Sequence, residues 1–66
     1  MEVFVNGNAK RIVDGTTIAG LLSELNVTQK HVAVEVNEQL VPRAKHAETL
    51  LKASDRLEVV TLVGGG

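Results

Sequence analysis

Residues 16–26 read TTIAGLLSELN and carry aliphatic side chains at helical spacing. The four positions i, i+3, i+4 and i+7 fall on one face of a helix; here they are Ile18, Leu21, Leu22 and Leu25. This apolar stripe predicts one amphipathic helix, which forms the main element of the core. The remaining segments must supply the surface that covers it.

The ends of this helix are marked by residues that satisfy or terminate helical hydrogen bonding. Thr16 or Thr17 can cap its start through a hydroxyl group that accepts from a free N–H. Asn26 is a suitable C-terminal stop because it tolerates the left-handed conformation. Gly20 weakens the helix by about 1 kcal/mol relative to Ala. We expect its missing side chain to let a strand approach closely.

Strand patterns lie on both sides of the helix. Before it, residues 3–5 lead into Asn6-Gly7, a dipeptide typical of tight hairpin turns, and residues 9–13 form the returning strand. After it, three more segments have strand character: residues 32–36, 39–41 and 57–63. Pro42 ends the middle one because proline has no N–H for a ladder.

The segment between the last two strands is polar and should contain one helical turn, within Arg43 to Thr49. Leu50 and Leu51 would anchor it, and Asp55-Arg56 would form the turn into the last strand. The resulting order is ββαβββ, which predicts an α+β fold with a mixed sheet of four to five strands packed on one helix. A right-handed crossover would place the first and last strands side by side and parallel.

The composition excludes several classes of function. The chain has 66 residues, a net charge of −1, one aromatic residue and no cysteine. A domain this small has little room for an internal pocket, so we expect no enzyme. It lacks the basic field and the aromatic side chains that nucleic-acid binding uses. No segment has the length of a membrane span or the pattern of a signal peptide, which predicts a cytoplasmic protein.

The C-terminus is the one part of the chain that looks suited to chemistry. Residues 1–63 are predicted to form the domain, and Gly64, Gly65 and Gly66 a flexible tail that is slim enough to enter a narrow channel. A merely flexible terminus is the simpler alternative. Phe4, Val60, Leu62 and Val63 are candidates for a docking surface on the outer sheet face. The alternative is that some of them belong to the core.

The charged and histidine side chains give weaker signals. Arg43, Lys45, Lys52 and Arg56 could form a cationic edge beside the tail, although ordinary solvated residues explain them better. His31 and His46 have no partners at ligand spacing. We expect both to be surface residues, with no metal site.

Several runs of the chain form one pattern: 32–37 (VAVEVN), 40–43 (LVPR), 55–60 (DRLEVV) and the glycines at the end. Taken together, they resemble the ThiS family, the sulfur carriers of thiamin biosynthesis. The likeness extends over essentially the whole chain. It implies a ubiquitin-like β-grasp carrier that binds no cofactor of its own. Because the chain has no cysteine, transported sulfur must be attached at the C-terminal carboxyl group.

The resemblance also implies a set of partners. An E1-like adenylyltransferase of the ThiF type would use ATP and magnesium to adenylate the Gly66 carboxylate. A persulfide would then supply sulfur, and a thiazole synthase of the ThiG type would consume the thiocarboxylate. Three alternatives share the glycine terminus or the fold: a carrier for molybdopterin, tRNA thiolation or cysteine, a ubiquitin-like modifier, and an interaction domain with an inert tail.

Overall fold

The computed structural model describes residues 1–27 and 29–61 of the 66-residue chain. The described residues form five strands, one α-helix and two short 3₁₀ helices. In chain order these are β1 (Glu2–Val5), β2 (Asn8–Arg11), α1 (Ile18–Glu24), η1 (Gln29–His31), β3 (Val32–Val36), β4 (Gln39–Val41), η2 (Arg43–Lys45) and β5 (Arg56–Thr61). The predicted ββαβββ order is confirmed.

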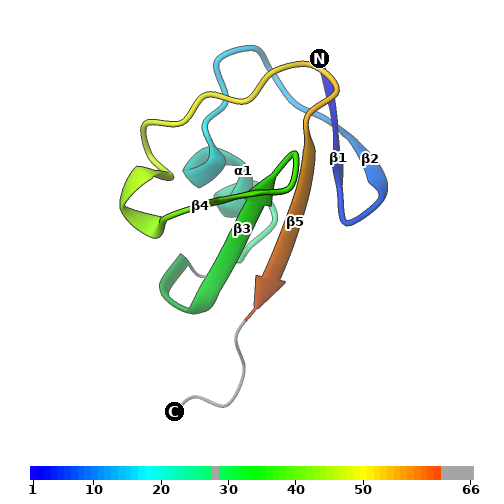
Figure 1. Ribbon diagram of the computed structural model, residues 1–66. Coiled ribbons are helices and arrows are strands. Elements are labelled where there is room, and N and C mark those ends of the chain that lie inside the picture. Colours follow the sequence, from blue (N-terminus) through cyan, green and yellow to red (C-terminus); the bar gives the residue numbers. More distant parts are fainter. Residues whose placement is uncertain (28, 62–66) are drawn as a thin grey trace.

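The strands form one mixed sheet in the order β2-β1-β5-β3-β4. β5 lies in the centre, parallel to β1 and antiparallel to β3 (Figure 1). The prediction that the first and last strands are parallel neighbours is therefore confirmed. As a consequence, the chain reaches its C-terminal residues from the middle of the sheet rather than from an edge.

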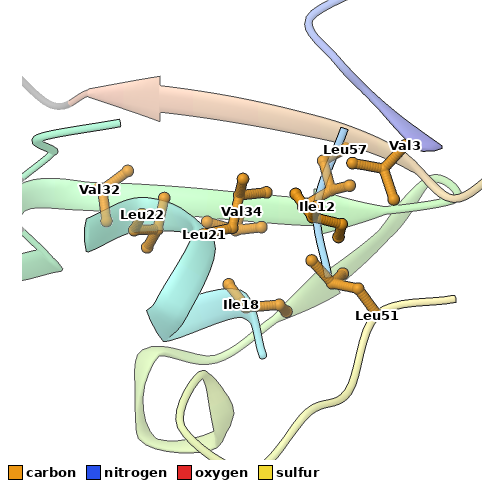
Figure 2. Packing of buried hydrophobic residues seen from close by; sticks show 9 residues of the cluster. All are labelled: Val3, Ile12, Ile18, Leu21, Leu22, Val32, Val34, Leu51 and Leu57. Carbon is orange, nitrogen blue, oxygen red and sulfur yellow. The ribbon is translucent and has the colours of Figure 1, made fainter. Parts of the chain in front are cut away.

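The helix packs on one face of this sheet, as the apolar stripe predicts (Figure 2). Ile18, Leu21 and Leu22 are completely buried, while Leu25 is partly buried at the margin of the cluster. The sheet and loops contribute the other members, Val3, Ile12, Val32, Val34, Leu51 and Leu57. Each buried CH₂ contributes about 0.8 kcal/mol, so this single cluster is the main source of stability.

The helix ends follow the predicted capping chemistry, whereas the prediction for Gly20 inside the helix does not hold. Thr17 is the N-cap, and its hydroxyl accepts from the Gly20 N–H at 3.1 Å. Asn26 has φ of 59°, as expected of a left-handed stop. The expectation that Gly20 admits a strand is wrong. The nearest atoms to a Cβ added there are Thr17 Oγ1 and Thr16 Cγ2, at 3.5 and 3.6 Å.

Two strand boundaries differ from the sequence prediction. β2 ends at Arg11 rather than at residue 13, because Ile12 turns into the core and donates its N–H to Met1 O at 2.8 Å. Val13 is consequently 73% exposed. The turn before β5 lies at residues 53–54, where Ser54 has φ of 70°, and not at Asp55-Arg56.

Two other assignments in the segment before β5 are corrected. Leu51 is buried as predicted, but the Leu50 side chain is 60% exposed and does not anchor the segment in the core. Asp55, placed in a turn by its polarity, is buried, and its carboxylate accepts from the Lys52 N–H at 2.7 Å. Its hydrogen bonds compensate for burial of the charge.

The expectation that both histidines lie on the surface holds for His31 and is wrong for His46. His46 is only 1% exposed, and its Nε2 is 3.0 Å from Val41 O, so this nitrogen donates to the carbonyl. Its backbone carbonyl accepts from the Ala19 N–H at 3.0 Å, next to the helix start. A histidine within a polar segment carries no sequence signal of such burial.

Candidate functional site: the C-terminal end of the central strand

The candidate site is the end of β5 from which the C-terminal residues continue. β3 pairs with β5 along its whole length, up to the partners Val32 and Thr61. On the other edge, β1 pairs only with the first part of β5, through Val5 and Leu57. The end of β5 lies at the end of the sheet opposite the chain's N-terminus (Figure 1).

The Asn6 side chain continues the contact on this second edge. Its Oδ1 accepts from the Val59 N–H at 2.8 Å, and its Nδ2 donates to Val59 O at 3.1 Å. Sequence reasoning predicted Asn6 only as a turn residue and missed this role. The Asn-Gly dipeptide signals the turn, and nothing in it indicates which strand the side chain reaches.

Val60 lies on the outer face of the sheet, opposite the helix. Along β5, Leu57 is buried and Val59 packs against the core, so the alternating residues point outward. Val60 is 53% exposed and faces Ala33 of β3 across the sheet. It therefore forms a small apolar surface one residue before the last described position, Thr61.

Phe4 lies on the same outer face, but it is half-buried beneath a cation. It is the cross-strand partner of Arg56, whose guanidinium carbon is 5.7 Å from the ring centroid, at cation–π distance. Arg56 and Val60 are four positions apart along β5, or about 13 Å at strand rise. The charged side chains of Arg56 and Glu58 lie between the two apolar residues, so Phe4 and Val60 share a face without forming one continuous patch.

The other predicted site residues, Leu62, Val63, Gly64, Gly65 and Gly66, lie outside the described residues. The proposed boundary between a domain at 1–63 and a flexible tail at 64–66 stays a prediction. What the structure describes is the strand that leads to this tail and the surface beside it.

The four cations considered as one edge, Arg43, Lys45, Lys52 and Arg56, belong to separate surroundings. Arg43 donates to Lys30 O at 3.3 Å, and Lys45 forms an ion pair with Glu48 at 3.2 Å. Arg56 lies over the Phe4 ring. These local contacts favour the interpretation of ordinary surface residues.

Residues 1–27 and 29–61 contain no group of three or more histidine, aspartate or glutamate side chains placed to hold a metal ion. Within the same ranges, no helix is long and apolar enough to cross a membrane.

The five-stranded sheet with its central last strand and its single packed helix is a ubiquitin-like β-grasp fold. The chain belongs to the ThiS family, which it matches over residues 3–66. The family resemblance and the fold predicted from the sequence are both confirmed.

Individual relatives extend this assignment. The chain is 29% identical to the sulfur carrier protein ThiS of Escherichia coli, and the match covers 100% of both chains. It also matches the crystal structure of the thiamine biosynthesis protein ThiS from Geobacter metallireducens, with 32% identity, complete coverage of both chains and a TM-score of 0.83.

A different kind of relative is much longer. The chain is 36% identical over 66 residues to a thiazole synthase of Paramagnetospirillum magneticum, and the match covers all of this chain but 20% of that one. A thiazole synthase of Magnetococcus marinus matches in the same way, with 38% identity. The chain thus spans about a fifth of the length of these two relatives.

Proposed function

We propose that this chain is a sulfur carrier for thiamin biosynthesis, a protein cosubstrate on which partner enzymes act. The observation that carries the proposal is the position of β5 in a chain of the ThiS family. This central strand is hydrogen-bonded on both edges and continues directly into Leu62–Gly66. A tail that starts from such a strand begins at a fixed point and in a fixed direction.

The reacting group is the carboxylate of Gly66. One of its oxygens attacks the α-phosphorus of ATP in an E1-like adenylyltransferase, with magnesium, and pyrophosphate leaves. A persulfide sulfur then attacks the acyl carbon and displaces AMP. A second thiol cleaves the resulting acyl disulfide, which releases the thiocarboxylate and leaves a disulfide on the donor side. The three glycines suit this chemistry because a backbone without Cβ atoms enters a narrow channel.

The proposed consumer of the thiocarboxylate is a thiazole synthase. Support comes from the two thiazole synthases in which a segment similar to this whole chain forms about a fifth of the protein. Joining a carrier and its consumer in one chain raises their effective concentration, which is useful only if the two must meet.

The proposed docking surface is the outer sheet face with Phe4 and Val60, extended by Leu62 and Val63. Exposed Val60 supports this assignment, since it lies on the outer face near the end of β5. Any enzyme that reaches the tail must also cover the end of this strand. A partner that packs on Val60 therefore gains binding energy from apolar contact where the tail begins.

The chemistry is tested by ATP–pyrophosphate exchange with the cognate adenylyltransferase. We expect exchange with the wild-type chain and none with a C-terminal amide, which lacks the carboxylate nucleophile. Extension by one alanine should also abolish exchange, because it displaces the reacting group and adds a Cβ. Undiminished exchange with the folded amide would refute Gly66 as the reacting group. Mass spectrometry should show one oxygen replaced by sulfur, whereas a modifier would show conjugates.

The docking surface is tested by a pair of matched substitutions. Val60→Asp places a charge at the proposed interface, and Val13→Asp places the same charge on a similarly exposed valine near the opposite end of the sheet. We expect the first to raise the Kd for the adenylyltransferase by tenfold or more, a loss of about 1.4 kcal/mol. The second should leave it unchanged. Equal affinities would exclude Val60 from the interface.

A further inference from the structure

The two edges of β5 are supported unequally. β3 accompanies β5 up to Thr61, whereas the β1 pairing ends at Val5 and Leu57. The last backbone hydrogen bond on the β1 side joins the Asn6 N–H to Leu57 O at 2.9 Å. The chain then turns away through Gly7. Without a further contact, the last residues of β5 would have support on one edge only.

The side chain of Asn6 supplies this contact in place of a backbone partner. A carboxamide is planar and offers both kinds of group that the backbone of a strand needs, a carbonyl oxygen that accepts and an NH₂ group that donates. Asn6 uses both, accepting from Val59 N–H at 2.8 Å and donating to Val59 O at 3.1 Å. The ladder on this edge therefore extends two residues further along β5.

The position of Val59 gives this extension its significance. Only Val60 and Thr61 follow it among the described residues, and Gly66 is seven positions further along the chain. A change in the direction of β5 at Val59 is carried into Val60 and Thr61 and so moves the point from which the tail starts. In a reaction that requires a near-attack geometry, a displacement of about 1 Å can lower the rate on the order of a hundredfold.

We propose that Asn6 is a positioning residue for the reaction at the C-terminus. It fixes the direction of β5 at Val59 and so delivers the tail to the adenylyltransferase on a constant course. The inference rests on the proposed function and adds a specific residue to it. Asn6 touches neither ATP nor the reacting carboxylate in this scheme, because it acts only through the backbone of β5.

The second hairpin provides a matched control. Asn37 also begins a two-residue turn, with φ of 51° against 50° at Asn6, and its side chain also bonds to β5. Its Oδ1 accepts from the Arg56 N–H at 3.0 Å, and its Nδ2 donates to Asp55 Oδ1 at 3.0 Å. These contacts lie at the start of β5, far from the tail, so they should affect stability without affecting the course of the tail.

The test compares Asn6→Gly with Asn37→Gly. Glycine adopts the positive φ of both turns, so each variant keeps its turn and loses only the side-chain amide. In native-state hydrogen exchange, Asn6→Gly should accelerate exchange at Val59, and Asn37→Gly should accelerate exchange at Arg56. In ATP–pyrophosphate exchange, Asn6→Gly should lower kcat about ten- to a hundredfold with an unchanged KM for the carrier. Asn37→Gly should change neither constant while it remains folded.

Each outcome decides a separate point. An active wild type together with equal kcat values for the two folded variants would overturn the positioning role of Asn6. Unchanged exchange at Val59 in Asn6→Gly would overturn it as well. A wild-type chain that supports no ATP–pyrophosphate exchange would instead overturn the proposed function. Asn6→Asp provides a check by chemistry, since it keeps the acceptor for Val59 N–H but places a carboxylate oxygen against Val59 O, and we expect the same loss of kcat.

Discussion

The two β-hairpins have nearly the same local geometry but different surroundings. In the first, Asn6 and Gly7 have φ of 50° and 86°; in the second, Asn37 and Glu38 have 51° and 71°. Positive φ at both central residues is the type I′ turn, whose twist matches that of paired strands. The first turn uses glycine where left-handed backbone is needed, whereas the second places a glutamate there.

The second hairpin compensates for the left-handed backbone of Glu38 through tertiary contacts that the first hairpin does not have. The Asn37 side chain bonds to buried Asp55, whose other oxygen accepts from Lys52 N–H. In the first hairpin Asn6 is exposed, and its side chain hydrogen-bonds to the backbone of Val59 alone among the described residues. The same turn chemistry therefore serves stability at one end of β5 and, in our proposal, the direction of the tail at the other.

The largest expected effect is at Asp55. Asp55→Ala leaves the Lys52 N–H and the Asn37 amide without their acceptor, which should lower the free energy of unfolding by about 2–3 kcal/mol. Urea denaturation measures it. Asp14→Ala is the control, because the Asp14 side chain is 89% exposed and its ion pair with the N-terminus spans 3.7 Å. If both variants unfold at the same midpoint, the second hairpin is not held by this buried network.

Next in size is the cost of a side chain in the first turn. Gly7→Ala should lower stability by about 1–2 kcal/mol, the cost of left-handed backbone for an L-residue. No described atom lies within 4 Å of a Cβ added at Gly7, so steric contact does not contribute. Thermal unfolding checks this expectation. Gly7→Asn should be nearly neutral, and a loss as large as that of alanine would show that the cause is not the backbone.

The reverse change in the second turn should stabilise the protein. Glu38→Gly relieves the positive φ at that position, and we expect a gain of roughly 0.5–1 kcal/mol after the larger backbone entropy of glycine is subtracted. Glu38→Ala keeps the unfavourable backbone and serves as the control for lost charge. If Glu38→Ala stabilises the protein equally, the gain comes from losing the glutamate side chain and not from relieving the backbone. The two hairpins would then not differ in backbone strain.

The smallest effect is expected at a glycine outside both turns. Gly20 lies in the helix, and a Cβ there would make ordinary contacts of 3.5 and 3.6 Å with the two threonines before it. Gly20→Ala should therefore raise stability by roughly 0.5 kcal/mol. Chemical denaturation measures this change. Gly15→Ala, at φ of 92°, is the comparison that should be destabilising, so the pair tests whether backbone conformation alone determines the sign of the stability change. A lower stability of Gly20→Ala would show that backbone conformation alone does not determine this sign.

Much of the fold could be predicted because its signals are local. The spacing of Ile18, Leu21 and Leu22 identified the buried helix face, and Asn6-Gly7 identified the first turn. The strand boundaries at Arg11 and Arg56 were less accurate. A strand ends where its neighbouring strand turns away, and the periodic pattern of the strand's own residues does not indicate that position.

The candidate site was only partly predictable. Exposed Val60 follows from alternation along β5, but whether Phe4 is free for contact does not, because Arg56 of another strand lies over its ring. Asn6 was missed because its partner is 53 positions away in the chain. The tail residues were selected by their chemistry, from the sequence alone.

By itself, the sequence determined the order of the elements, the amphipathic helix and a terminus of three glycines, since each depends on residues close together in the chain. Tertiary structure alone decided that His46 and Asp55 are buried, that Gly20 faces its own threonines and that Asn6 meets Val59. The physical reason is that a polar side chain is stable wherever its hydrogen bonds are satisfied. Its partners are supplied by segments that only the assembled sheet brings together.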